Sequence, residues 1–209
     1  MVNWGNRNQA IYGDSAIPPT MVWDSAKRAY LDFIDACLTF PPFPTLARVH
    51  WTAPPTGFFK VNVDGTTGAG GGNSCIGVVI RDSSGFPISA LSLVLPSSFP
   101  AKTTEAYALL HGVLFASEMQ VHQALFESDA LSIIHDLTSE VPSNDFGHIL
   151  EDIRVASNTF RHCSFHHLKR DSNRAAHTLA LEAKCLGQSK IWKGISPLYI
   201  QDILRDDLL

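Results

Sequence analysis

Residues 58–65, FFKVNVDG, constrain the fold of this chain more than any other stretch. From residue 59 to 63, two valines and a phenylalanine alternate with a lysine and an asparagine. This period-two alternation is typical of a β-strand that packs one face on a core. Asp64 follows the strand directly and precedes Gly65. Burying an unpaired carboxylate is costly, so we expect Asp64 either to shape a turn or to bind a cation.

The hydrophobic pattern of the following residues predicts a mixed α/β fold. Strands are expected at residues 58–63, 75–81, 86–95, 124–127 and 161–168, and helices at residues 102–119, 131–137, 146–160, 171–186 and, weakly, from residue 198. Short glycine-bearing connections join the first three strands, which favours an antiparallel meander. The later strands alternate with helices, as in βα units. We therefore expect a mixed five-stranded sheet with helices on both faces.

The flanking segments differ from this pattern. Apolar residues at three- and four-residue steps predict a helix over residues 21–40, and residues 41–57 contain five prolines, which favours a semi-rigid connector. We therefore expect three parts. Residues 1–55 form a helical extension with a proline-rich linker, residues 56–190 form the α/β domain, and residues 191–209 form a C-terminal tail.

The composition argues against several classes of protein. The chain has no run of eighteen apolar residues that would indicate a transmembrane helix, and its polar N-terminus lacks the apolar core of a secretory signal. The four cysteines are scattered without CxxC spacing, which argues against a zinc knuckle and favours a reducing compartment. We therefore expect an intracellular protein, in the nucleus or the cytoplasm, without a membrane partner. We also expect it to be a monomer.

Charge is distributed unevenly along the chain. Residues 103–153 contain nine carboxylates and no Lys or Arg, whereas residues 154–193 contain eight basic residues, two acidic residues and four histidines. A net charge of −4 argues against general nucleic-acid binding. A basic segment beside an acidic one is compatible with phosphate binding next to a cation site, and equally with solvated helix faces of opposite sign.

Three carboxylates lie where the predicted elements meet. Asp64 follows the first strand, Asp129 follows the fourth, and Glu105 lies in the first turn of the helix between them. If these strands are neighbours, the side chains converge at one edge of the sheet and need a counter-charge. Oxygen-rich clusters of this kind select hard cations such as Mg²⁺. Taken singly, each residue also fits a structural role, as a turn former, a helix N-terminal charge or an N-cap.

Five motifs follow one another along the chain: KVNVDG, GVVIRDSSG, EAYALLHGV, ESDAL and RDSNRAAHTLA. Together they resemble the plant ribonuclease H-like domain of reverse-transcriptase-like and retroelement-derived proteins. Trp4, Arg7 and Asn8 also look like the W-x-x-R-N segment that precedes this domain in plant non-LTR retroelement polyproteins. The resemblance implies a ribonuclease H-like fold and hydrolysis of the RNA strand of RNA–DNA hybrids, with the hybrid or another nucleic acid as partner.

The resemblance also implies roles for individual residues. The metal-binding carboxylates of the family fall on Asp64, Glu105 and Asp129, which would bind two Mg²⁺ or Mn²⁺ ions. The fourth catalytic and metal-binding position, usually Asp, falls on His177. Imidazole is a poorer partner for Mg²⁺ than a carboxylate, but it suits Mn²⁺ or proton transfer. The candidates for nucleic-acid contacts are Asn62, Lys169, Arg170, Asn173 and Arg174.

Two functions remain open at this point. The first is a metal-dependent ribonuclease of the RNase H type. The second is a catalytically inactive ribonuclease H-like module that binds nucleic acid or protein, because His177 also fits a relic of lost activity. His166 and His167 lie where active relatives carry a histidine that helps product release, but their place in a predicted strand favours a structural role for at least one.

Overall fold

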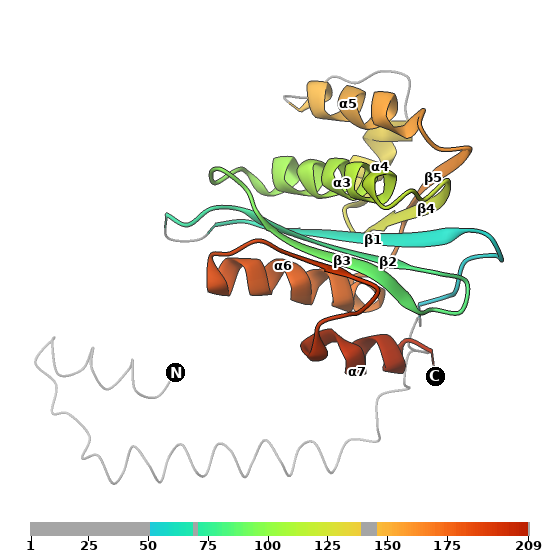
Figure 1. Ribbon diagram of the computed structural model, residues 1–209. Coiled ribbons are helices and arrows are strands. Elements are labelled where there is room, and N and C mark those ends of the chain that lie inside the picture. The colour runs from blue at the N-terminus through green and yellow to red at the C-terminus, as the bar shows by residue number, and fades with distance from the viewer. Residues whose placement is uncertain (1–50, 69–70, 139–145, 209) are drawn as a thin grey trace, which may run out of the picture. The chain divides into compact units, whose positions relative to one another are not determined.

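A six-stranded mixed sheet forms the centre of the computed structural model, which describes residues 51–68, 71–138 and 146–208 (Figure 1). The strands are β1 (Phe59–Thr66), β2 (Cys75–Arg81), β3 (Pro87–Val94), β4 (Gln123–Ser128), β5 (His162–His167) and β6 (Lys190–Lys193). The predicted helix over residues 21–40, the W-x-x-R-N segment and most of the proline-rich connector lie outside the described residues.

The strands are arranged in the order β5-β4-β1-β2-β3-β6. β1, β2 and β3 form the predicted antiparallel meander, while β4 pairs in parallel with both β1 and β5. The prediction of five strands was one short, because β6 pairs antiparallel with β3. Its sequence, KIWK, has four residues and a lysine at each end, so it carries no alternation that distinguishes a strand from a loop.

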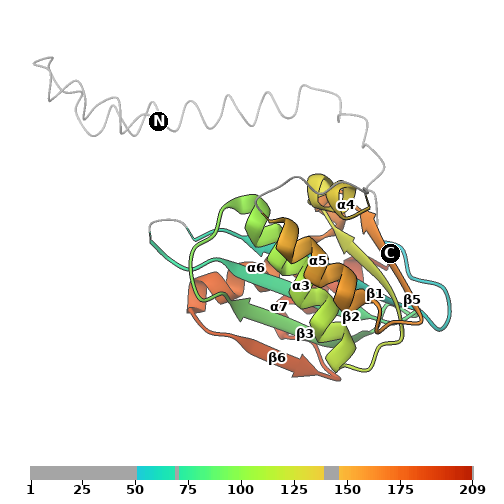
Figure 2. The same cartoon turned by 90° about the horizontal axis from the view of Figure 1, so that it is seen from above.

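Helices cover both faces of the sheet, as predicted (Figures 1 and 2). They are α3 (Ala101–Glu118), α4 (Leu131–Thr138), α5 (Gly147–Ser157), α6 (Arg174–Leu186) and α7 (Leu198–Asp206), with a 3-10 turn, η1 (Arg170–Ser172), before α6. α3, α4 and α5 lie on one face, and α6 and α7 lie on the other. Within the described ranges, no helix is both long and apolar enough to cross a membrane.

Each face of the sheet has its own apolar core. The larger core lies under α3, α4 and α5 and includes Val61, Leu109 and Leu150, all fully buried. The smaller core lies under α6 and α7 and includes Leu179 and Ile200. Residues 190–206, which we assigned to a C-terminal tail and its boundary, thus contribute an edge strand and a packed helix to this side of the sheet.

β1 is buried on both faces, which its alternating pattern did not indicate. The side of Lys60 and Asn62 was expected to lie away from the core, yet these residues are only 4% and 1% exposed. They are buried because other polar groups pair with them. Lys60 forms an ion pair with Glu127, and Asn62 bonds to the same carboxylate. Burial of polar groups is tolerated when each one has a partner.

Two glycines let helices approach the end of β1 closely. Gly77 lies opposite Asp64 in the β1–β2 register, and a Cβ at Gly77 would lie 2.1 Å from the carbonyl oxygen of Ala176 in α6. A Cβ at Gly65 would lie 3.0 Å from the carbonyl oxygen of Thr104 in the first turn of α3. Gly77 therefore has no room for a side chain and Gly65 has little, because α6 and α3 both come close to the end of β1 near Asp64.

Candidate active site

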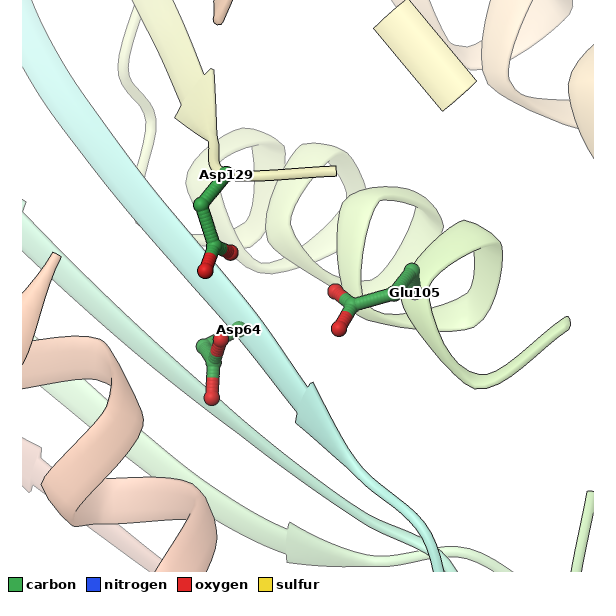
Figure 3. Close-up of side chains that lie close together, drawn as sticks. All are labelled: Asp64, Glu105 and Asp129. Carbon is green, nitrogen blue, oxygen red and sulfur yellow. The ribbon is translucent and has the colours of Figure 1, made fainter. Parts of the chain in front are cut away.

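Three carboxylates converge where β1, β4 and α3 meet (Figure 3). Asp64 lies in β1, Asp129 directly follows β4, and Glu105 is the fifth residue of α3, one turn in from its N-terminus. One oxygen of each carboxylate lies within 4.8 Å of the others. Asp64 is 3% exposed, and the other two residues are partly buried. The structure therefore brings together the three carboxylates that were singled out from the sequence.

Strand pairing explains why two of these carboxylates are neighbours. β1 and β4 run parallel, and Asn62 of β1 lies opposite Glu127 of β4. Asp64 and Asp129 each follow two positions later, so both emerge at the carboxyl ends of adjacent strands. Functional side chains collect at this edge in α/β sheets because adjacent parallel strands end there together.

Proximity and burial change the ionisation of the carboxyl groups. Burial and the charges of Asp64 and Asp129 raise the pKa of Glu105 to about 8, although the backbone N–H of Gly65 donates a hydrogen bond to it. Burial raises the pKa of Asp64 to about 6. The hydrogen bond from His177 lowers this pKa, and the negative charge of Asp129 raises it. Without a bound cation, the three carboxyl groups therefore do not all carry a full negative charge at neutral pH, although Arg170 favours the ionised form of Glu105.

The donor set fits a hard divalent cation. Oε2 of Glu105 is buried and has no hydrogen-bond partner among the described residues. A buried oxygen without a partner raises the free energy of the folded state, and a bound cation removes that cost. Carboxylate oxygens are the ligands that Mg²⁺ and Mn²⁺ prefer. Asp64, Glu105 and Asp129 are therefore the residues that would hold such an ion.

His177 binds Asp64 rather than completing the group of three. Its Nδ1 lies 2.8 Å from Oδ2 of Asp64, and its Nε2 lies 3.5 Å from Nη2 of Arg170. A guanidinium only donates hydrogen bonds, so Nε2 accepts and the imidazole proton is assigned to Nδ1. The prediction that His177 belongs to the site is consistent with this contact. Its role as a metal ligand stays a prediction.

Asn173 lies next to the site in the protein interior and is almost completely buried. It is 1% exposed, and its Nδ2 lies 2.8 Å from the carbonyl oxygen of Val63 and 3.4 Å from Oδ1 of Asp129. It also directly precedes α6, which carries His177. The prediction that Asn173 contacts nucleic acid is therefore replaced by a positioning role, because its Nδ2 bonds inside the protein and its Oδ1 is buried, without a hydrogen-bond partner among the described residues.

Asn62 is also removed from the predicted nucleic-acid contacts. Its Oδ1 accepts hydrogen bonds from Nε1 of Trp51 at 3.0 Å and from Arg81 at 3.1 Å, and its Nδ2 donates to Glu127 at 2.8 Å. The alternation of β1 correctly placed Asn62 on the face opposite the valines. It gave no sign that this face is covered, because the covering residues come from distant parts of the chain.

Lys169, Arg170 and Arg174 are exposed along the connection from β5 to α6. Arg170 reaches His177, so its cationic head lies beside the carboxylate cluster. Arg174 begins α6 and lies 4.0 Å from Asp206, with both side chains about half exposed. These three basic residues therefore remain candidates for phosphate contacts.

His166 and His167 close β5, and both are exposed. Nε2 of His166 lies 2.8 Å from Oγ of Ser164 in the same strand. Their predicted location in a strand is thus confirmed. A contribution of either residue to product release stays a prediction.

Arg81 is a buried polar residue whose importance sequence reasoning missed. It ends β2 and is 1% exposed, and its Nη1 lies 2.8 Å from Oδ2 of Asp207. The available signal was an arginine at the end of the apolar strand CIGVVIR, because a buried guanidinium needs a carboxylate partner. The partner itself is 126 residues away in the chain, so no local pattern identifies it.

A mixed sheet between two helical layers, with carboxylates at the ends of adjacent strands, defines a ribonuclease H-like fold. Solved structures share it. RNase H1 from Halobacterium salinarum is 18% identical with a TM-score of 0.58, over 63% of this chain and 99% of that one. The N-terminal RNase H domain of rv2228c from Mycobacterium tuberculosis is 16% identical with a TM-score of 0.56, over 62% and 94%. LC11-RNase H1, isolated from compost by a metagenomic approach and solved with an RNA/DNA hybrid, is 19% identical with a TM-score of 0.55, over 62% and 98%.

The sequence itself identifies the family. A model of the family described as reverse transcriptase-like matches residues 62–183, which is more than half of the chain. The chain therefore belongs to the reverse transcriptase-like family, as the sequence resemblance implied. None of the curated proteins matches it. Origin in a plant and in a non-LTR retroelement stays a prediction.

Proposed function

We propose that this protein binds RNA–DNA hybrids and cleaves their RNA strand endonucleolytically with divalent cations, Mg²⁺ or Mn²⁺. The observation that carries the proposal is the convergence of Asp64, Glu105 and Asp129 at the strand ends of a ribonuclease H-like fold. Membership of the reverse transcriptase-like family and the fold shared with RNase H1 enzymes support it. One of those enzymes was solved with an RNA/DNA hybrid.

The carboxylates would hold the ions, and the surrounding residues keep the carboxylates in place. In a two-ion centre, the ions supply an activated water and stabilise the leaving oxygen during displacement at phosphorus. His177 donates a hydrogen bond to Asp64, which fixes the orientation of that carboxylate. Asn173 does the same for Asp129 while it holds the β1 backbone. Both contacts reduce the rearrangement needed to bind a cation.

Binding of the hybrid would use exposed basic residues beside the cluster. Lys169, Arg170 and Arg174 would contact phosphates, which contribute affinity without reading sequence. Proteins recognise A-form-like duplexes through their shape and 2′-hydroxyl groups. The chain therefore needs no base-specific contacts for this activity. A monomeric state and a location in the nucleus or the cytoplasm remain predictions.

A cleavage assay on a labelled RNA–DNA hybrid, with Mg²⁺ and separately with Mn²⁺, tests the proposal. Wild type is expected to cut the RNA strand of the hybrid and to leave duplex DNA intact. Asp64→Asn and Asp129→Asn should each lower the rate at least 100-fold, because each removes a charged ligand. Asp202→Asn is the matched control, since Asp202 lies in α7 with its side chain 85% exposed. Wild type that binds hybrid but never cuts it with either ion contradicts the proposal.

The hydrogen bond between His177 and Asp64 favours one alternative, a catalytically inactive module that keeps the fold. In that case the bond replaces metal coordination at Asp64. Asp64→Asn and Asp129→Asn would then leave hybrid binding unchanged and raise the melting temperature, because they relieve carboxylate repulsion. The same two variants therefore separate the alternatives, since an active centre loses cleavage and an inactive one gains only stability.

A further inference from the structure

A network of buried polar side chains lies beneath the carboxylate site, on the face of the sheet that α6 and α7 cover. We call it the buried polar network, and its members are Trp51, Lys60, Asn62, Arg81, Glu127 and Asp207. It contains two cationic and two anionic residues, so its formal charge is balanced. The metal-binding proposal uses none of these six residues.

A continuous chain of hydrogen bonds runs from α7 to the central strands. Asp207, directly after α7, pairs with Arg81 at 2.8 Å, and Arg81 donates to Oδ1 of Asn62 at 3.1 Å. Asn62 donates in turn to Oε2 of Glu127 at 2.8 Å, while Oε1 of Glu127 pairs with Lys60 at 2.8 Å. Each link is a direct contact between buried or mostly buried side chains.

The network ends directly next to the carboxylate site. Asn62 and Glu127 are opposite each other in the β1–β4 pairing, and their side chains bond to each other. Two residues further along the chain lie Asp64, in β1, and Asp129, the first residue after β4. A side-chain bond between paired strands fixes their relative height and twist at that level. The bond between Asn62 and Glu127 does so two residues before Asp64 and Asp129, so it fixes the strands close to both carboxylates.

Arg81 is the central member of this chain of contacts. Its guanidinium carbon lies 3.5 Å from the centre of the Trp51 ring, and Trp51 also donates a hydrogen bond to Asn62. Burial lowers the pKa of Arg81, and Asp207 opposes that shift. A fully buried guanidinium that loses its carboxylate is strongly unfavourable, so Arg81 depends on Asp207. Asp207 lies beyond residue 183, where the match to the family model ends.

We propose that Asp207 and Arg81 are positioning residues of the carboxylate site. Through Asn62 and Glu127 they fix the ends of β1 and β4 at the spacing that lets Asp64 and Asp129 share a cation. The segment after α6 is therefore part of the active-site support. If the network served stability alone, apolar residues of similar volume would replace it at little cost. Hydrogen bonds fix direction as well as distance, which suits a role in positioning the two strands. This inference rests on the proposed metal-dependent function.

Three variants test the proposal. Asp207→Asn leaves Arg81 without its carboxylate, and the double variant Arg81→Met with Asp207→Leu removes both charges and restores apolar packing. Asp202→Asn, on the exposed side of α7, is the matched control. The affinity for Mn²⁺ is measured by titration calorimetry well below the melting temperature. The amide NMR signals of Asp64 and Asp129 are compared in the metal-free proteins.

We expect Asp207→Asn to lower the melting temperature by about 10 °C and to weaken Mn²⁺ binding about fivefold. This loss is smaller than the 10–100-fold typical of groups that bond a ligand directly, because Asp207 acts through intermediates. The double variant should regain the melting temperature but keep the weak Mn²⁺ binding and the shifted amide signals of Asp64 and Asp129. Asp202→Asn should match wild type in all three measurements.

Wild-type Mn²⁺ affinity and wild-type amide signals in the double variant would overturn the positioning role, even if Asp207→Asn proves too unstable to study. Failure of the proposed function gives a different result, in which wild type itself binds no Mn²⁺ and cuts no hybrid. The amide signals of Asp64 and Asp129 still decide the positioning role in that case. Signals that move in the double variant support it, and unchanged signals contradict it.

Discussion

Nδ1 of His177 lies 2.8 Å from Oδ2 of Asp64, so the first turns of α6 and the end of β1 are joined by one side-chain bond. The close approach of α6 to β2 at Gly77 makes this bond possible, because Gly77 lies opposite Asp64 in the sheet. His177 thereby favours the ionised form of Asp64, the form that binds a cation.

His177→Ala should shift the pH dependence of cleavage to higher pH. The hydrogen bond from His177 lowers the pKa of Asp64, so its removal raises that pKa further above about 6. The acidic limb of the kcat/KM profile, measured with Mn²⁺, should move upward by up to about one pH unit. His177→Asp should instead bind Mg²⁺ more tightly than wild type, because it adds a carboxylate. Overlapping profiles for His177→Ala and wild type would show that the bond has no influence on Asp64.

The metal-free protein should lose stability as the pH rises from about 4 to about 8. The folded-state pKa values of Asp64 and Glu105, about 6 and about 8, lie above their ordinary values of 3.8 and 4.5. The folded state therefore binds more protons than the unfolded state in this window, and the free energy of unfolding falls with pH. Allowing for solvent screening, we expect a loss of about 1–3 kcal/mol, measured by urea unfolding.

Two further unfolding measurements test whether the carboxylate cluster causes this pH dependence of stability. Glu105→Gln should flatten the pH dependence, because it removes the group with the largest shift. Mg²⁺ or Mn²⁺ should restore stability at pH 8 more than at pH 5.5, since the cation binds the ionised carboxylates. A free energy of unfolding that rises between pH 5 and pH 8 without metal would contradict the assignment of the cluster.

Local sequence pattern was sufficient to predict the helices and the strands from β1 to β5, but it did not predict β6 or the surroundings of the site. The alternation of β1 and the periodicity of α3 are properties of consecutive residues, so Asp64 and Glu105 could be placed on their elements. Asp129 was predicted to join them if the first and fourth strands are neighbours, and β1 and β4 do pair in parallel. The burial of Asn62 was not predictable, because it depends on Arg81 from another strand.

The remaining differences between the sequence-based predictions and the structure lie on the side of the sheet that α6 and α7 cover. β6 has too few residues for a period, and α7 is short, so neither pattern shows that this segment packs on the sheet. Asn173 was named from the sequence as a candidate for contact with nucleic acid. Only the fold shows that α6 begins beneath β1 and turns this side chain toward the Val63 carbonyl. Long-range pairing of polar groups leaves no periodic signal in a sequence.

Gly65→Ala should disturb the position of Glu105 and weaken metal binding. A Cβ at this position would lie 3.0 Å from both the carbonyl oxygen and a methyl carbon of Thr104, so α3 has to move outward. We expect a loss of about 1–3 kcal/mol in the free energy of unfolding and a weaker affinity for Mn²⁺. Gly147→Ala in α5 is the matched control, because a Cβ there would meet no atom within 4 Å. Equal Mn²⁺ affinity in the two variants would show that the approach of α3 does not set the site.

Arg170→Ala should weaken hybrid binding and reduce its salt dependence. Arg170 is exposed in η1 and lies 3.5 Å from His177, so a phosphate bound at the carboxylate cluster would lie near this guanidinium. Loss of one phosphate contact should reduce the slope of log Kobs against log salt by about 1. Arg161→Ala is the control, because Arg161 is exposed just before β5, at the end of that strand away from the site. Fluorescence anisotropy of a labelled hybrid over a salt series measures both slopes. If both variants keep the wild-type slope, the hybrid does not bind along the connection from β5 to α6.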